Sequence, residues 1–264
     1  MSYSNLFKQS TDPLTLSQIE EVAPSVFTTS PSENVSDKYT FIPTTQILED
    51  MDREGWEVHQ VSQRKSKQAN GQYTKHMLRL RNPHVAKIGD SVPEIILTNS
   101  HDGRNAFSLH AGLFRLVCSN GLIIADQTFE QTRIKHQWYD MNQVKELTDN
   151  VIKSVPQIAG KMTQFEQTLL NDTQRTEFAK NAIRLRWGQG HDNITVDDML
   201  FATRDADRGN SLWKVFNVVQ EKLLRGGMIY NLPTGRQQTV RALTNIDEQV
   251  KVNKNLWNLA EAYI

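Results

Sequence analysis

Polar and apolar residues alternate along several short segments in the first half of the chain. Residues 56–63 and 73–81 both show this alternation, which is typical of strands that bury one face. The segment 64–71 between them is basic and polar, so the two strands are predicted to form a hairpin with a long loop. Asn82 and Pro83 then end the second strand.

Further strands are predicted beyond this hairpin. Residues 94–99 and 106–118 are largely apolar and flank a polar turn, and a short strand over residues 122–125 follows Asn120 and Gly121, which are predicted to form another turn. Consecutive strands with short connections usually pair with their neighbours. The sequence therefore predicts an antiparallel meander of four or five strands.

Apolar residues recur at helical spacing after residue 140. Val144, Leu147 and Val151 begin the pattern, which continues beyond Pro156 to Leu169. Further helices are predicted over residues 177–187, 197–200, 211–224 and 253–263. Because strands come first and helices follow, we expect an α+β fold in which an N-terminal antiparallel sheet packs against C-terminal helices.

The pattern also predicts how the chain is divided. Residues 1–38 are rich in Ser, Thr, Pro and acids, and are expected to form an irregular leader with one short helix near residues 17–22. Residues 39–264 are expected to form a single α+β domain, sheet-rich over 39–140 and helix-rich over 141–264. It opens with a helix over residues 46–54, with Thr44 or Thr45 as its cap.

Composition narrows the class of protein. The chain has 30 basic and 30 acidic residues among its 264, so its net charge is zero and nucleic-acid binding would need a local basic face. A single cysteine, Cys118, excludes an internal disulfide and suits a reducing compartment. No secretion signal or membrane-spanning stretch is visible. We therefore expect a cytoplasmic protein with no membrane partner.

The polar stretch of residues 98–105 is the first candidate site. It contains His101 and Asp102, with Arg104 beside them. One explanation is turn chemistry, since Asn99 and Asp102 can bond their own backbone and Gly103 suits a hairpin corner. The other is an anion-binding or acid/base cluster. A metal site that also used His110 and Cys118 lacks the usual ligand spacing, so no metal is predicted.

Two basic segments are candidate anion-binding surfaces. Alternation places Lys75, Arg79 and Arg81 on one strand face, which is either an ordinary solvated face or a surface that follows phosphates. The second segment holds Arg225, Gly226 and Gly227, followed by Arg236 and Arg241. The glycines can simply end a helix, or the arginines and a helix start near Gln237 can bind an anion.

Short identities along most of the chain resemble a known family. They comprise Tyr39-Thr40, Ile42-Pro43, Arg53-Glu54-Gly55, Tyr73 to Arg81, Pro93 to Leu97, Asn99 to Gly103, Phe114-Arg115, Val117-Cys118, Asn120-Gly121, Gln220-Glu221, Arg225-Gly226-Gly227, Arg241-Ala242, Ile246-Asp247, Leu256-Trp257 and Ala260-Glu261. In these residues the chain is similar to the domain-of-unknown-function 932 family, particularly its YfjQ/YafZ-type members. The resemblance implies a prophage or plasmid context, often near genes for DNA processing or defence, and supplies no catalytic residues.

Three functions of different classes remain as hypotheses. The leading one is a mobile-element accessory protein that binds nucleic acid, with single-stranded DNA favoured, in the manner of annealing or recombination proteins that act as homo-oligomers. The second is a non-catalytic host-interaction or anti-defence protein with a host protein partner. The third is a hydrolase or nuclease that uses His101 and Asp102. Binding is favoured over catalysis, and no cofactor is predicted.

Overall fold

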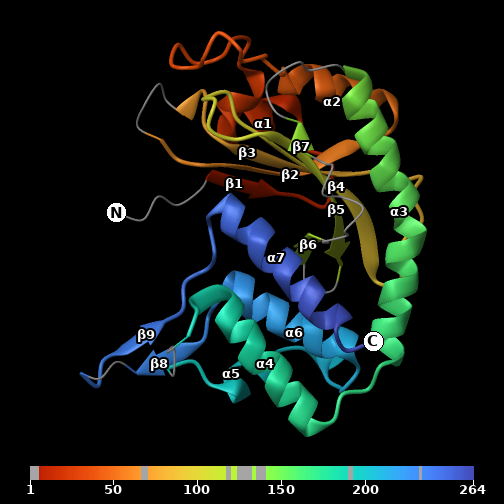
Figure 1. Ribbon diagram of the computed structural model, residues 1–264, viewed down its shortest axis with the longest axis vertical. Coiled ribbons are helices and arrows are strands. Elements are labelled where there is room, and N and C mark those ends of the chain that lie inside the picture. Colours follow the sequence, from red (N-terminus) through yellow and green to blue (C-terminus); the bar gives the residue numbers. More distant parts are fainter. Residues whose placement is uncertain are drawn as a thin grey trace. The chain divides into compact units, whose positions relative to one another are not determined.

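The computed structural model describes residues 6–66, 71–116, 120–123, 133–134, 141–189, 193–231 and 234–264. The chain divides into two compact units, Met1–Val155 and Pro156–Ile264. In Figure 1 the first unit runs from red to green and the second from green to blue. The boundary falls inside one long helix, α3 (Met141–Gln167).

The first unit is built on an antiparallel meander, as the alternating pattern predicted. Its strands follow one another in the order β1 to β6, and β7 pairs with β5 beside β6. The bounds are Leu6–Gln9 (β1), Glu57–Gln63 (β2), His76–Arg81 (β3), Ser91–Asn99 (β4), Phe107–Arg115 (β5), Asn120–Ile123 (β6) and Arg133–Ile134 (β7). With helices after the strands, the α+β fold class is confirmed.

Residues 6–38 contain three short regular elements. The predicted helix is present as α1 (Leu16–Val22), where Thr15 caps the first turn and Gln18 reaches back to the Thr15 backbone in a capping box. A 3-10 helix, η1 (Pro24–Phe27), follows. The strand β1 pairs antiparallel with β2 and was not predicted. It is only four residues long, too short for an alternating pattern to stand out.

One face of the sheet carries the apolar core of the first unit. The helices α1 and α2 (Thr44–Arg53) lie over this face (Figure 1). Four successive strands each contribute one fully buried side chain to this face: Val61, Leu78, Leu97 and Leu109. Burying side chains of this size contributes roughly 1.5–3 kcal/mol each relative to exposure.

The second unit is mainly helical. Its elements after α3 are α4 (Asp172–Trp187), α5 (Val196–Leu200), the 3-10 helix η4 (Asp205–Asp207), α6 (Leu212–Arg225) and α7 (Ile246–Glu261), which begins seven residues before the predicted helix. Aromatic rings form the centre of its core: Phe165 lies 4.9 Å from Trp257 and 6.3 Å from Phe216 between ring centroids. Among the described residues, none of the helices is both long and apolar enough to cross a membrane.

A small hairpin separates α6 from α7. Its strands are β8 (Ile229–Asn231) and β9 (Gln237–Thr239), which pair antiparallel. Figure 1 shows it extending away from the helices of its own unit. The sequence predicted a helix start near Gln237, which is wrong, because Gln237 opens β9 and pairs with Asn231.

Candidate functional site

The His101-Asp102 pair belongs to a tightly bonded turn. One oxygen of the Asp102 carboxylate accepts hydrogen bonds from the Ser100 hydroxyl (2.9 Å) and the Arg104 backbone N–H (3.1 Å). The Gly103 φ angle is +72°, a value that favours glycine. The His101 side chain is fully buried, with its ring 4.8 Å from that of Phe41. Turn chemistry and packing therefore explain why these polar residues occur together.

A directed chain of hydrogen bonds runs beneath this turn. Asn99 Nδ2 donates to Thr44 Oγ1 (3.0 Å), which lies 3.0 Å from His76 Nε2. His76 Nδ1 lies 2.8 Å from Ser25 Oγ, which donates to Gln63 Oε1 (2.5 Å). Because Ser25 Oγ donates onward to Gln63, it accepts from His76 Nδ1–H. Each donor in this series of hydrogen bonds therefore meets an acceptor only when His76 is neutral and carries its proton on Nδ1.

Burial keeps the histidine of this hydrogen-bond chain uncharged. Full burial, and then the neighbouring His101, holds the pKa of His76 well below its usual value. Burial, and then the Asp102 carboxylate, raises the pKa of Tyr39, whose hydroxyl donates to the Ser100 carbonyl (3.2 Å). Thr44, expected as a helix cap, lies inside α2 and bonds His76 instead. These groups connect β2, β3 and β4 to η1 and α2, and we assign them a structural role.

The basic strand face differs from both predictions made for it. Arg79 and Arg81 share a face, as predicted, but they are neither solvated nor arranged along a phosphate-binding surface. Arg79 Nε lies 2.7 Å from Glu94 Oε2 and Arg81 Nε lies 2.8 Å from Glu94 Oε1. All three side chains are at least 90% buried. Antiparallel register brings Glu94 directly opposite Arg81, which explains why this carboxylate is the partner.

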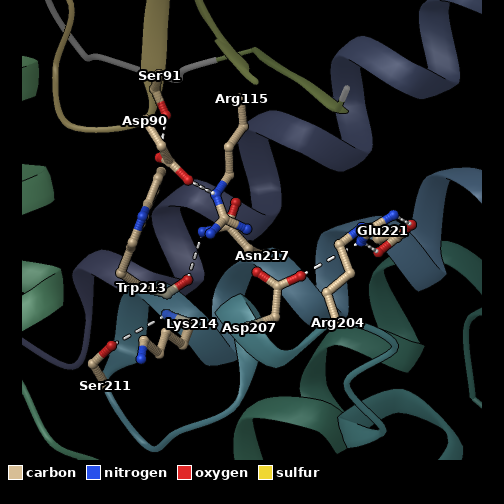
Figure 2. Close-up of polar contacts among 10 residues, drawn as sticks. All are labelled: Asp90, Ser91, Arg115, Arg204, Asp207, Ser211, Trp213, Lys214, Asn217 and Glu221. Carbon is tan, nitrogen blue, oxygen red and sulfur yellow. Dashed lines mark hydrogen bonds and ion pairs between the residues drawn. The ribbon is translucent and has the colours of Figure 1, made fainter. Parts of the chain in front are cut away.

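Other charged groups of the sheet are also paired. The guanidinium of Arg81 lies over the Phe114 ring at 3.6 Å. Arg115 Nε donates to Asp90 Oδ2 at 2.6 Å, a pair drawn in Figure 2. Burial lowers the pKa of Arg79 from its usual value. Arg79, Arg81 and Arg115 therefore neutralise carboxylates within the first unit.

The remaining predicted residues of the first unit lie in several different settings. Lys75 is half-buried and precedes β3, and Arg104 is exposed at the turn. Asn120 and Gly121 were predicted as a turn, but they are the first residues of β6, opposite Arg115 and Phe114. Cys118 lies outside the described residues. In the part of the chain that the structure describes, no three His, Cys, Asp or Glu side chains gather as a metal site.

Arg236 of the third predicted cluster lies in the hairpin of β8 and β9, and Arg225 and Arg241 flank it on either side. We call this hairpin, together with Arg225 and Arg241, the arm. Main-chain bonds hold its root: Gly227 N donates to the Val240 carbonyl (2.9 Å), and Leu243 N donates to the Leu224 carbonyl (2.7 Å). Gly226 ends α6 with φ of +68°, and a Cβ there would lie 2.3 Å from the Val240 carbonyl oxygen. Only glycine fits this position, so the direction in which the arm leaves α6 is fixed.

An arginine that was not singled out in the sequence braces the same root. The guanidinium of Arg186, at the end of α4, donates to the carbonyl of Arg241 at 2.5 Å and to that of Leu223. Burial lowers its pKa to about 10, so it remains protonated at neutral pH. Its ring neighbour is Trp187, at 4.7 Å from the guanidinium carbon. Arg186 therefore joins the last turn of α4 to both sides of the arm root.

The arm is strongly cationic. The sequence from Lys222 to Ile246 contains no acidic residue but includes four basic ones: Lys222, Arg225, Arg236 and Arg241. Arg236 and Arg241 are exposed, as are Gln237, Gln238 and Thr239 of β9. Arg225 is half exposed and lies 3.9 Å from Glu221. Tyr230 donates its hydroxyl to Gln238 at 2.6 Å across the two strands.

Comparison with known protein families gives a match over most of the chain. The model of the family described as "Domain of unknown function (DUF932)" matches residues 31–257. The chain belongs to this family. The match includes the arm, α4 and most of the buried hydrogen-bond chain, and it begins after β1, α1 and η1, so Ser25 lies outside it.

Two relatives from Escherichia coli strain K12 extend the comparison. The chain is 36% identical to UPF0380 protein YafZ over 253 residues, which is 96% of this chain and 92% of the relative. It is 35% identical to UPF0380 protein YfjQ, with the same coverage. No solved structure matches the chain. The similarity to these relatives thus covers nearly the whole chain, and the description of the DUF932 family assigns no activity.

Two residues important for the contacts described above carried no sequence signal. Glu94 opens an apolar segment and Arg186 sits near the end of a helix, positions where exposed charges are common. Their partners are 13 and 15 residues away for Glu94 and 37 and 55 residues away for Arg186. The absence of acidic residues between Lys222 and Ile246 was visible in the sequence, and it is the signal that identifies the arm.

Proposed function

We propose that this protein binds nucleic acid through the arm, with single-stranded DNA as the favoured ligand. The observation that supports the proposal is an exposed hairpin with two exposed arginines, Arg236 and Arg241, in a stretch of sequence that has no acidic residue between Lys222 and Ile246. Release of counterions from phosphates drives such binding, and it depends on local charge rather than on the net charge of the chain. The zero net charge is therefore compatible with it.

The chemistry of the arm suits a phosphate backbone. Arginine forks bind phosphate oxygens in pairs. Gln237 and Thr239 present exposed side chains that donate hydrogen bonds to phosphate and sugar oxygens. The brace from Arg186 uses main-chain carbonyls, so the exposed guanidinium of Arg241 is not consumed in holding the root.

A role in a mobile element follows as part of the same proposal. A protein that binds single strands suits annealing or recombination of phage, prophage or plasmid DNA, in which several copies act along one strand. Lys75 and Arg104 are in the other unit and are not part of the proposed surface. The hydrolase alternative loses support because His101 is fully buried and Asp102 bonds its own turn. The host-interaction alternative remains a prediction.

Binding of a fluorescent single-stranded oligonucleotide, measured by anisotropy over a series of salt concentrations, tests the proposal. Each phosphate contact on a single strand contributes about 0.7 to the slope of log K against log salt. Changing both Arg236 and Arg241 to Gln is expected to lower affinity at low salt and to reduce the slope by about 1.4, from two lost contacts.

One exposed arginine outside the arm provides the control. The Arg53 side chain in α2 is 69% exposed and pairs with Asp50. Arg53→Gln should leave the oligonucleotide affinity and its salt slope unchanged. Circular dichroism confirms that each variant is folded. No binding by the unmodified protein at low salt, or equal losses in Arg53→Gln and the arm variant, would refute the proposal.

A further inference from the structure

A cavity in the second unit lies outside every feature discussed so far. It has a volume of about 390 Å³ and lies between α4, the segment from α5 to η4, and α6. This volume is in the range of roughly 300–1,000 Å³ that small-molecule sites occupy. Its lining combines apolar and charged side chains from residues far apart in sequence: Arg175, Leu200, Phe201, Ala202, Asp207 and Val218 among them.

The charged groups of this cavity offer both donors and an acceptor. Arg175 has a buried Nε with no hydrogen-bond partner among the described residues, and its Nη1 lies 3.3 Å from the exposed carboxylate of Asp172. A buried donor without a partner costs roughly 1–3 kcal/mol, which a ligand acceptor would offset. The structure thus leaves a hydrogen bond to be made at Arg175.

The acceptor is the carboxylate of Asp207, whose side chain is 2% exposed. It lies 3.5 Å from Arg204, but Arg204 forms a closer two-bond fork with Glu221, at 2.5 and 2.7 Å (Figure 2). One guanidinium is therefore shared between two carboxylates, with the better geometry toward Glu221. Asp207 lines the cavity, and because a carboxylate oxygen accepts more than one hydrogen bond, it offers an acceptor to an amino or imino group of a ligand.

Phe201 gives the cavity an aromatic wall. It follows α5 directly and is 66% exposed, which is unusual for a ring of this size. Lys222 Nζ lies 5.7 Å from the ring centroid, and Lys222 is also the first of the four basic residues that lead into the arm. Lys222 lies in the last turn of α6, from which the arm leaves, so Phe201 and the start of the arm belong to the same unit.

We propose that this cavity receives one unpaired base of the strand that the arm binds. The base stacks on Phe201, its amino or imino edge donates to Asp207, and Arg175 donates from its free Nε to an acceptor of the same nucleotide. This inference rests on the proposed function of the arm, and it adds the reason for strand selectivity. Bases within a duplex are already paired and stacked, so they reach such a cavity only after flipping, at a cost of a few kcal/mol.

The test compares a single-stranded oligonucleotide with a duplex of the same sequence, using Phe201→Leu and Phe201→Tyr. Stacking of a base on an aromatic side chain contributes about 1–3 kcal/mol, which corresponds to at least about fivefold in affinity. Phe201→Leu should weaken single-strand binding by that factor and leave duplex binding unchanged, while Phe201→Tyr should keep the affinity. Leu169→Ala is the control, since Leu169 is an equally exposed apolar residue of the same unit.

Separate readouts distinguish the cavity from the arm. If the variant of Arg236 and Arg241 loses binding but Phe201→Leu does not, the arm is supported and the cavity proposal is overturned. Equal losses on single strand and duplex in Phe201→Leu would also overturn it. Calorimetry with dCMP and dAMP tests the cavity without the arm. Saturable binding that Arg175→Gln removes supports the cavity, even where oligonucleotide binding fails, and no mononucleotide binding at millimolar concentration counts against it.

Discussion

Arg79 and Glu94 form a salt bridge of 2.7 Å in which the arginine side chain is 5% exposed and the glutamate is fully buried. The same carboxylate binds Arg81 with its second oxygen at 2.8 Å. Removing one partner of a buried ionic group leaves the remaining charges without compensation, which is far more costly than removing an exposed pair. We therefore expect Arg79, Arg81 and Glu94 together to stabilise the sheet, and not to form a binding surface.

Replacement of Glu94 by Gln should lower the free energy of unfolding by about 3–5 kcal/mol, because two buried guanidiniums lose their counter-charge. Urea denaturation followed by circular dichroism measures the change. Asp50→Asn breaks the exposed pair with Arg53 and should cost less than about 1 kcal/mol. Similar small effects for both variants would show that Glu94 does not compensate these arginines.

The buried His76 predicts acid sensitivity. Its folded-state pKa is lowered by burial and by His101, so the unfolded chain binds the proton more readily. Stability is then complete above the unfolded pKa of about 6.5 and falls as the pH drops below it, by up to about 1.4 kcal/mol per pH unit. His59, whose pKa is lowered by burial and by Arg81, adds to the same trend.

Urea midpoints at pH 7.5 and 5.5 measure this dependence. His76→Gln should reduce the pH dependence of stability, and the part that remains reflects His59. His84→Gln, which changes an exposed histidine, should leave the dependence as it is. An unchanged pH dependence in His76→Gln would contradict the neutral, directed hydrogen-bond chain.

Two adjacent glycines at the arm root give a matched pair of variants. Both have positive φ angles, +68° for Gly226 and +84° for Gly227, so alanine costs roughly 1–2 kcal/mol of backbone strain at either position. At Gly226 the added Cβ also meets the Val240 carbonyl oxygen at 2.3 Å, whereas nothing lies within 4 Å at Gly227. Gly226→Ala should be the more destabilising by thermal unfolding and should also weaken oligonucleotide binding. Equal effects would contradict the fixed root.

Arg186→Lys tests the brace. Lysine keeps the positive charge but lacks the planar fork that reaches the carbonyls of Leu223 and Arg241 together. We expect a loss of about 1.5–3 kcal/mol in unfolding free energy, the value of a hydrogen bond to a charged group. Arg184→Lys, on the exposed side of the same helix end, should have little effect. Hydrogen exchange of the Leu243 amide gives a local readout, because that amide bonds the Leu224 carbonyl.

Much of the first unit could be predicted because alternation reports which residues share a face. Residues 56–63 and 73–81 alternate, and these ranges contain the strands β2 and β3. Alternation does not report what covers a face. The burial of Arg79 and Arg81 depends on Glu94, and only the pairing register brings that carboxylate opposite Arg81. A basic strand with a distant acidic partner reads the same, in sequence, as a basic strand without one.

The arm shows the opposite balance. Its arginines and glycines were identified, but its structure was not, because three-residue strands such as Gln237–Thr239 are too short to show a periodicity. Cross-strand bonds such as that of Tyr230 with Gln238 form it instead. The cavity beside Phe201 was not predicted at all, since its walls come from three separate segments of the second unit.

The root of the arm is held by main-chain groups and by Gly226, while its exposed residues take little part in holding it. Substitutions at Arg236, Gln237 or Thr239 therefore change what the arm presents without changing where it points. Such a design separates the evolution of ligand preference from the maintenance of the fold. If the arm binds a ligand as proposed, family members can differ in ligand preference through a few side chains on an unchanged support.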